Sequence, residues 1–175
     1  MSLTGVFVYP IKSCKGISCE RSRLTSTGLQ YDREWMLIDV KTRRFVSQRS
    51  VPKLSRVHVD VYPSHALFES TSSEDALLRV STPEMSNTLQ VPLGKRAKEE
   101  EVLVEAKVWS WSGNAHDEGD DAAKWFSTFL GVDVRLVRFC SHRQTEPEFA
   151  PDSETAFSDG YPYLMTTQGK LTFRM

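Results

Sequence analysis

Two lysines, a hydroxyl, a thiol and a glycine stand together where the first strand-like segment of the chain ends. In "VYPIKSCKGISC" (residues 8–19) they are Lys12, Ser13, Cys14, Lys15 and Gly16. Such a group fits three interpretations: a solvated basic loop, a metal or redox site built on the thiol, or a cradle for an anionic ligand. The other reactive residues of the chain bear on the choice.

The cysteines are weak support for a metal or redox site. Cys14 and Cys19 form a C-x4-C pair, and Cys140 and His142 follow only far downstream. Structural zinc needs four ligands, so one such pair is a weak signal, and ordinary thiols are favoured. Three cysteines are also an odd number in a chain without a secretion signal. They therefore indicate free thiols and not a disulfide framework.

A second basic residue of interest lies in "YDREWMLID" (residues 31–39), where Asp32 and Arg33 precede a β-rich run. On these residues alone, a solvated ion pair is the favoured interpretation. Arginine can also hold a phosphate or a planar carbonyl group through two parallel hydrogen bonds, which lysine cannot do. If the strand at 34–40 lies beside the strand at 6–11, Arg33 and Lys12 converge on one anion.

Composition and charge are those of a soluble globular domain with an uneven charge distribution. The 175 residues are 39% hydrophobic and 26% charged, and no apolar run approaches the roughly 18 residues that span a bilayer. The N-terminus is too short and polar for a signal peptide, so we expect an intracellular protein that is not secreted. Residues 1–56 hold eleven Lys/Arg and four Asp/Glu, which favours an anionic ligand, although evenly spread surface lysines give the same count. No nucleic-acid-reading motif is present, so nucleic acid is not an expected partner.

Hydrophobic periodicity predicts a strand-rich chain with one helix. We expect strands in the runs at 5–11, 34–40, 45–50, 55–63, 76–82, 88–93, 102–113 and 132–139. Residues 41–44 are expected to form the turn of a hairpin between the second and third of these strands. Residues 117–131 instead carry Ala122, Ala123, Phe126, Phe129 and Leu130 at helical spacing. Gly131 is a natural C-cap, and the acidic cluster "DEGDD" at the start favours helix capping over a cation site.

The chain contains five motifs that, in this order, resemble the MOSC family: "VYPIKSCKG", "GLQYDREWMLID", "VWSWSGNAHDEGDDAAKWFSTFLG", "VRLVRF" and "FSDGYPYLM". This family includes the C-terminal domains of molybdenum cofactor sulfurases and the mitochondrial amidoxime-reducing components. The resemblance implies an α+β, β-rich fold: a β-barrel-like MOSC N-terminal domain with one amphipathic helix. It places this domain at residues 1–140, a linker at 141–157, and the beginning of a truncated MOSC domain at 158–175.

The resemblance also implies a binding site for the molybdenum cofactor, a molybdopterin. The family's Lys-Ser pair after the first strand falls on Lys12 and Ser13, and the arginine of its Asp-Arg-x-Trp motif falls on Arg33. Its Ser-Asp-x-x-Pro segment falls on Ser158, Asp159, Gly160, Tyr161 and Pro162. The strand end then becomes half of a cradle, in which Lys12 and Arg33 supply charge, Ser13 supplies a hydroxyl and Cys14 is only a neighbour.

The resemblance implies that complete relatives are oxidoreductases. They reduce N-hydroxylated compounds such as amidoximes with electrons from cytochrome b5 and its reductase. Their metal-ligating cysteine follows the Ser-Asp-x-x-Pro segment, whereas this sequence stops at Met175. We therefore expect the chain to bind cofactor but to be inactive alone, with no catalytic residue of its own. The alternatives are a non-catalytic cofactor-carrier or interaction fragment, and a sulfurase-like module associated with pyridoxal phosphate, whose upstream domain we do not expect here.

Overall fold

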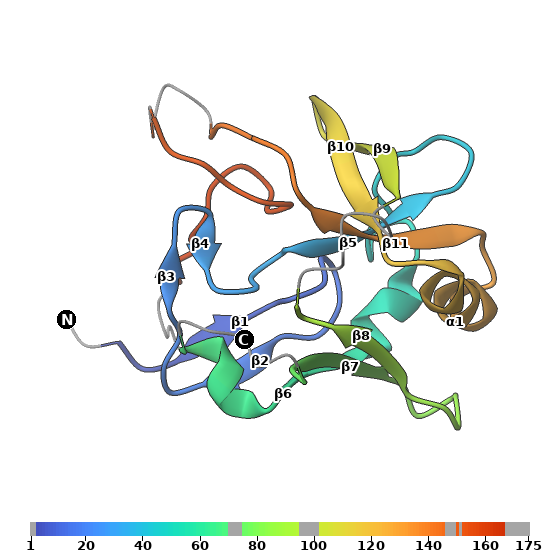
Figure 1. The fold of residues 1–175 in the computed structure, drawn as a ribbon, viewed down its shortest axis with the longest axis horizontal. Coiled ribbons are helices and arrows are strands. Elements are labelled where there is room, and N and C mark those ends of the chain that lie inside the picture. Colours follow the sequence, from blue (N-terminus) through green and yellow to red (C-terminus); the bar gives the residue numbers. More distant parts are fainter. Residues whose placement is uncertain (1–2, 70–74, 95–101, 146–149, 151, 167–175) are drawn as a thin grey trace, which may run out of the picture.

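The computed structural model describes residues 3–69, 75–94, 102–145, 150 and 152–166, and Figure 1 shows the fold. The strands are β1 (Val6–Val8), β2 (Ile17–Cys19), β3 (Leu24–Thr25), β4 (Gly28–Leu29), β5 (Trp35–Asp39), β6 (His58–Tyr62), β7 (Leu77–Ser81), β8 (Leu89–Pro92), β9 (Leu103–Val108), β10 (Trp111–Asp117) and β11 (Val134–Phe139). The helices are α1 (Asp120–Leu130) and the short 3-10 turns η1 (Pro52–Arg56) and η2 (Ser64–Leu67). The predicted α+β, strand-rich fold with one amphipathic helix is confirmed.

The central sheet is antiparallel, with the strand order β5-β11-β10-β9. Strand β5 is apolar at successive positions because both faces of this sheet are covered. Trp35 and Leu37 face the main core, which they share with α1 and the second sheet. Met36 and Ile38 point to a smaller core on the opposite face. A strand buried on both sides loses the polar alternation of a half-exposed strand.

The second sheet, β6-β7-β8, closes the main core from below in Figure 1. The predicted alternation along β6 is confirmed: Val57, Val59 and Val61 are buried, whereas His58 and its alternate neighbours are exposed. Alternate side chains of a strand point to opposite faces, so this pattern fixes the register of β6 against the core. Two short pairs, β1-β2 and β3-β4, complete the strand structure.

Helix α1 packs against β11 and β8 through its apolar face. Gly131 ends the helix in the left-handed conformation (φ 74°), and its N–H donates to the carbonyl of Ser127 at 2.9 Å, as expected for a glycine C-cap. The apolar spacing predicts Ala123 as part of the buried face, but Ala123 is only half-buried. Trp125, which that spacing leaves out, is buried in the face. No helix in the described part of the chain has the length and apolar character needed to cross a membrane.

The acidic cluster at the start of α1 serves two purposes. Asp120 lies in the first turn, where the predicted interaction with the helix dipole applies. Asp117 and Glu118 are instead buried, and they pair with Arg135 and Arg138 of β11. Half of the cluster therefore joins the helix start to the central sheet and does not cap the helix.

Two predicted strands have a different structure. Residues 102–113 are not one strand but a hairpin, in which β9 and β10 are joined at Trp109, whose φ is +52°. Residues 45–50 contain only an isolated bridge between Phe45 and Ile38, after which residues 47–51 form a turn. The predicted hairpin at 34–50 is thus reduced to its first strand, its connection and one bridge.

The segment after β11 folds back on the body of the domain. It makes a bridge between Gln144 and Glu154, and then buries Phe157 against Trp111 and Phe139. Residues 158–162 form bends and residues 163–166 are irregular, so no strand begins here, and residues 167–175 of the predicted MOSC beginning lie outside the described residues. In Figure 1 this red segment runs beside β3 and β4. A Cβ added to Gly28 of β4 would lie 3.0 Å from the Pro162 carbonyl oxygen, so the two segments are in contact.

Candidate anion-binding site

The end of β1 is joined to the start of β5 by backbone hydrogen bonds. Ile11 forms a parallel bridge with Trp35, the Lys12 N–H donates to the Trp35 carbonyl at 2.8 Å, and the Arg33 N–H donates to the Tyr9 carbonyl at 2.8 Å. The proximity of the two segments, predicted as a condition for a shared anion site, is confirmed. Lys12 and Arg33 are thereby held on neighbouring stretches of backbone.

The backbone is unusual at two of these positions. Ser13 (φ 70°) and Arg33 (φ 48°) both adopt the left-handed region, although neither is glycine. Such conformations cost of order 1–3 kcal/mol and persist only where the surrounding structure enforces them, commonly at ligand sites. The turns that direct Lys12 and Arg33 toward the same region are therefore maintained by the fold at the expense of local conformational preference.

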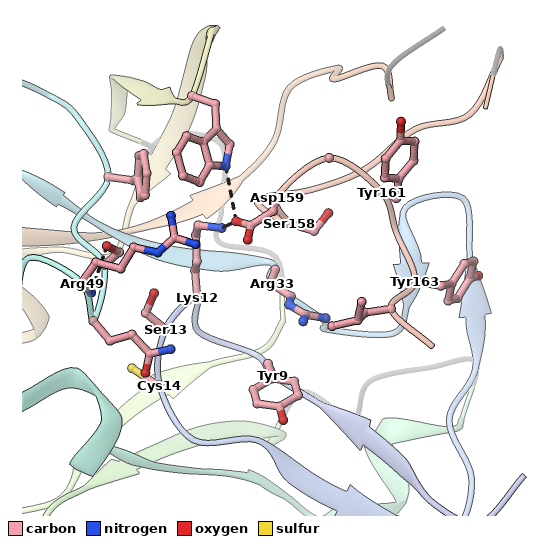
Figure 2. Close-up of a pocket in the computed structure, with 16 residues that line it drawn as sticks. Tyr9, Lys12, Ser13, Cys14, Arg33, Arg49, Ser158, Asp159, Tyr161 and Tyr163 are labelled. Carbon is pink, nitrogen blue, oxygen red and sulfur yellow. Dashed lines mark hydrogen bonds and ion pairs between the residues drawn. The ribbon is translucent and has the colours of Figure 1, made fainter. Parts of the chain in front are cut away.

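A cavity of about 330 Å³ opens at this junction (Figure 2). Its walls contain all seven residues that the resemblance pointed to: Lys12, Ser13, Arg33, Ser158, Asp159, Gly160 and Tyr161. Lys15 and Gly16 of the same sequence motif are not part of the lining. The Lys15 ammonium instead lies 2.8 Å from the imidazole Nε2 of His58. The fold thus separates two lysines that are only three positions apart.

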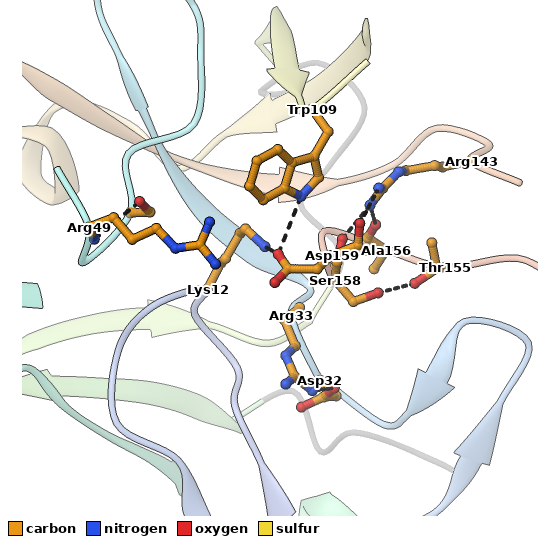
Figure 3. A network of polar contacts seen from close by, with 11 residues as sticks. Lys12, Asp32, Arg33, Arg49, Trp109, Arg143, Thr155, Ala156, Ser158 and Asp159 are labelled. Carbon is orange, nitrogen blue, oxygen red and sulfur yellow. Dashed lines mark hydrogen bonds and ion pairs between the residues drawn. The ribbon is translucent and has the colours of Figure 1, made fainter. Parts of the chain in front are cut away.

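Lys12 is already paired in this structure. Its ammonium donates to the Asp159 carboxylate, which also accepts from the Trp109 indole N–H at 3.3 Å (Figure 3). Burial lowers the pKa of Lys12 despite this partner. Partial burial acts to raise the pKa of Asp159, but the hydrogen bond and charge of Lys12, with smaller contributions from Trp109 and Arg49, outweigh it and leave that pKa lowered. Both trends reflect a charge pair at the boundary between the core and solvent.

Arg33 is paired as well, with the buried carboxylate of Asp32. That carboxylate also accepts the Tyr9 N–H at 2.7 Å, and the Arg33 guanidinium carbon lies 4.9 Å from the centre of the Tyr9 ring. Burial raises the pKa of Asp32, although the neighbouring charge and both hydrogen bonds act in the opposite direction. The carboxylate and the ring together fix the direction of the guanidinium.

The far wall of the cavity is positioned by Arg143, which the sequence did not point to. This arginine is buried and donates to the carbonyls of Ala156 at 2.8 Å, Ser158 at 2.6 Å and Asp159 at 3.4 Å (Figure 3). The Thr155 hydroxyl hydrogen-bonds to that of Ser158. Arg143 therefore sets the path of the segment that carries Asp159 to Lys12, a contact between residues 147 positions apart.

Further lining residues were also missed by sequence reasoning. They are Tyr9, Phe45, Ser47, Gln48, Arg49, Trp109, Tyr163 and Leu164, whereas Cys14, which was expected beside the cradle, also lines the cavity. Residues 45–50 had been interpreted as a strand, so the only available signal was the arginine in "VSQRS". Trp109 had been placed inside a continuous strand, where its exposure at a turn was hidden.

The metal or redox interpretation of Cys14 receives no support. Its thiol is buried and its pKa is raised far above the usual range by burial, so the thiolate needed for metal binding or nucleophilic attack is disfavoured. All three cysteines are free, and among the described residues no three His, Cys, Asp or Glu side chains gather as metal ligands.

Charge and shape together define the ligand that this cavity suits. Three cations, Lys12, Arg33 and Arg49, face one carboxylate, Asp159, and five aromatic side chains share the lining with them. The volume falls at the lower end of the range for small-molecule sites. Guanidinium groups bind phosphates, and aromatic walls suit a planar ring. The residues present therefore fit a planar heterocycle that carries a phosphate.

These features of fold and site define a strand-rich domain with a cavity lined by three cations, and comparison with known proteins identifies the family. The MOSC N-terminal beta barrel domain matches residues 1–133, and the chain belongs to this family. It is 29% identical to the mouse mitochondrial amidoxime-reducing component 1 over 95% of this chain and 47% of that protein. It is 31% identical to the molybdenum cofactor sulfurase of Drosophila grimshawi over 78% of this chain and 17% of that protein.

A solved structure shares the fold. The solution structure of a Bordetella bronchiseptica protein superimposes with a TM-score of 0.55 at 20% identity, over 86% of this chain and 94% of that one. At this identity the likeness concerns the fold alone. The chain spans about half the length of the amidoxime-reducing components that it matches.

Proposed function

We propose that the chain binds the molybdenum cofactor, a phosphate-bearing pterin, in the cavity between β1, β5 and the 158–161 segment. The observation that carries the proposal is the gathering of Lys12, Ser13, Arg33 and the 158–161 segment around one cavity with a cationic surplus. Relatives named for amidoxime reduction and for molybdenum cofactor sulfuration support it.

The residues have distinct parts in this proposal. Lys12 and Arg33 attract the phosphate and donate hydrogen bonds to it, and Ser13 adds a hydroxyl donor. Asp159 accepts hydrogen bonds from N–H groups of the pterin, and Tyr161 contributes to the wall beside it. When bound, the cofactor supplies a metal that changes oxidation state, whereas this chain's residues bind and orient the pterin.

The wider activity is a further part of the proposal. We infer that the chain belongs to an oxidoreductase of N-hydroxylated compounds that works with cytochrome b5 and its reductase inside the cell, in the mitochondrion or the cytosol. The names of the mitochondrial relatives support the amidoxime-reducing and mitochondrial parts of this inference, and the cytochrome b5 partner rests on the family resemblance alone. A non-catalytic carrier of the same cofactor uses the same cavity, and a sulfurase-like role linked to pyridoxal phosphate predicts a different ligand preference.

The experiment is purification of the chain from a host that makes the molybdenum cofactor, followed by analysis of bound pterin and molybdenum. Wild-type protein is expected to retain the pterin. Lys12→Ala should reduce the retained amount, because one charge-assisted hydrogen bond contributes about 1.5–3 kcal/mol, or roughly tenfold or more in affinity. Arg33→Lys should also reduce it, since lysine keeps the charge but loses the paired donors.

Lys15→Ala is the matched control, because Lys15 lies three positions away and contacts His58 outside the cavity. It should retain pterin like the wild type. The proposal fails if wild-type protein carries no pterin, or if Lys15→Ala is as damaging as Lys12→Ala. Tighter binding of pyridoxal phosphate than of molybdopterin would favour the sulfurase-like alternative.

A further inference from the structure

Of the three cations that line the cavity, Arg49 alone forms no ion pair within 4.0 Å among the described residues, although its charge acts on Asp159 over a longer distance. Lys12 is paired with Asp159 and Arg33 with Asp32. An anion that approaches Lys12 must compete with a carboxylate already in place, and the same holds at Arg33. In the described part of the chain no carboxylate is in contact with the donors of Arg49, so an incoming anion reaches them without displacing one.

The turn that carries Arg49 is well defined. The carbonyl of Ser47 accepts the N–H groups of Ser50 at 3.0 Å and Val51 at 2.8 Å, and also the Ser50 hydroxyl at 2.9 Å. The Ser47 hydroxyl accepts the Arg49 N–H at 3.3 Å. On the preceding side, the Val46 N–H donates to the Leu37 carbonyl of β5 at 2.8 Å. The backbone at Arg49 is therefore fixed before any ligand arrives, which reduces the entropy lost on binding.

An aromatic surface supports the guanidinium. The central carbon of the Arg49 guanidinium lies 5.8 Å from the centre of the Trp109 ring. Trp109 in turn packs on Phe45, with the two ring centres 4.9 Å apart. Trp109 is 40% exposed and has a φ of +52°, a strained combination for a bulky residue. Neither burial nor turn preference accounts for a tryptophan here. Its contacts with Phe45, Asp159 and Arg49 do account for it, and they place the ring between Arg49 and the carboxylate that pairs with Lys12.

We propose that Arg49, supported by Trp109 and presented by the Ser47–Val51 turn, is the primary phosphate-receiving residue of the cavity. This inference rests on the proposed function and refines it, because Lys12 then joins the phosphate only after Asp159 releases it. Figures 2 and 3 show Arg49 and Arg33 on either side of Lys12, with Asp159 beside it, and Figure 3 shows Trp109 next to Asp159. The group recognised is a phosphate monoester dianion, which the guanidinium binds through two parallel hydrogen bonds.

The test uses inorganic phosphate as the probe and the fluorescence of the four tryptophans as one readout, with calorimetry as the second. Phosphate should change the wild-type emission because Trp109 lies against the binding group. Arg49→Ala should weaken phosphate binding by roughly tenfold, and Arg49→Lys by a smaller factor, as the paired donors are lost but the charge is kept. Trp109→Phe should abolish most of the emission change while calorimetry still detects binding.

Arg44→Ala is the matched control, because Arg44 is an exposed arginine of the same connection that does not line the cavity. Arg44→Ala removes the same charge and should leave the phosphate affinity within about twofold of the wild type. Salt screens the interaction between the exposed Arg44 and a phosphate in the cavity, so the loss of this charge has only a small effect. Arg49 is exposed, so circular dichroism of Arg49→Ala should match the wild type.

The inference is overturned if Arg49→Ala binds phosphate like the wild type, or if Arg44→Ala weakens binding equally. It is also overturned if wild-type protein binds no phosphate. The amount of pterin that stays bound after purification distinguishes a failure of this inference from a failure of the proposed function. Retention that depends on Lys12 and Arg33 but not on Arg49 leaves the proposed function intact and removes only the part given to Arg49.

Discussion

Neutralising Glu34 should make the protein more stable at alkaline pH. Burial raises the pKa of Glu34 to about 7, with the charge of Arg138 opposing the rise and that of Glu118 adding to it. In the unfolded chain the same carboxyl titrates near its ordinary value of 4.5. Between these two values the folded protein retains a proton that the unfolded chain has lost.

The sign follows from this difference in proton binding. The contribution of Glu34 to stability is fully present below about pH 4.5 and is lost as the pH rises through about 7. At about 1.4 kcal/mol per pKa unit, the interval corresponds to about 3 kcal/mol. Glu34 keeps part of its surface in contact with solvent, which screens the charge, so we expect roughly 2 kcal/mol.

The perturbation is Glu34→Gln, which keeps the shape and removes the titration. The free energy of unfolding of both proteins is measured by urea denaturation at pH 5 and pH 8. The difference between Glu34→Gln and the wild type should be roughly 2 kcal/mol more favourable to the variant at pH 8 than at pH 5. All other titrating groups are common to both proteins and cancel in this comparison. Glu105→Gln is the control, because hydrogen bonds from Ser112 and Lys107 lower the pKa of Glu105, and it should bring no gain at pH 8. A Glu34→Gln difference that is the same at both pH values would refute the reasoning.

Three further perturbations test the packing and the site. Phe157→Ala should lower the free energy of unfolding by about 3–5 kcal/mol in urea denaturation, since this buried ring packs on Trp111 and Phe139; a loss under 1 kcal/mol would mean that the segment is only loosely attached. Arg143→Met should lower the free energy of unfolding by about 2 kcal/mol and speed amide exchange at residues 158–160, because the carbonyls that Arg143 binds lose their donor. Unchanged exchange would contradict the positioning role of Arg143. Asp159→Asn should tighten inorganic phosphate binding several-fold in calorimetry, because Lys12 is freed and a negative charge is removed; weaker binding would show that the carboxylate does not compete with the anion.

Local patterns in the sequence were sufficient for several elements. The alternation at Val57, Val59 and Val61 predicts β6, and apolar spacing together with Gly131 predicts α1. Both patterns depend on interactions within a few residues, where strand and helix geometry repeat regularly. The hairpin at Trp109 escaped prediction because its turn has none of the usual Gly, Pro, Asn or Asp residues, and its left-handed conformation is imposed by the fold.

The candidate site divides in the same way. The sequence by itself, through its ordered motifs, determined which segments to consider: Lys12 with Ser13, Arg33, and the 158–161 run. Only the tertiary structure decided that these segments line one cavity, that Lys15 lies outside it, and that Arg143 holds the far wall. It also decided that Lys12 pairs with Asp159 and Arg33 with Asp32, whereas Arg49 forms no ion pair with any described residue. Pairing energies depend on distance and burial in space, and residues 12 and 159 acquire a common environment only when the chain has folded.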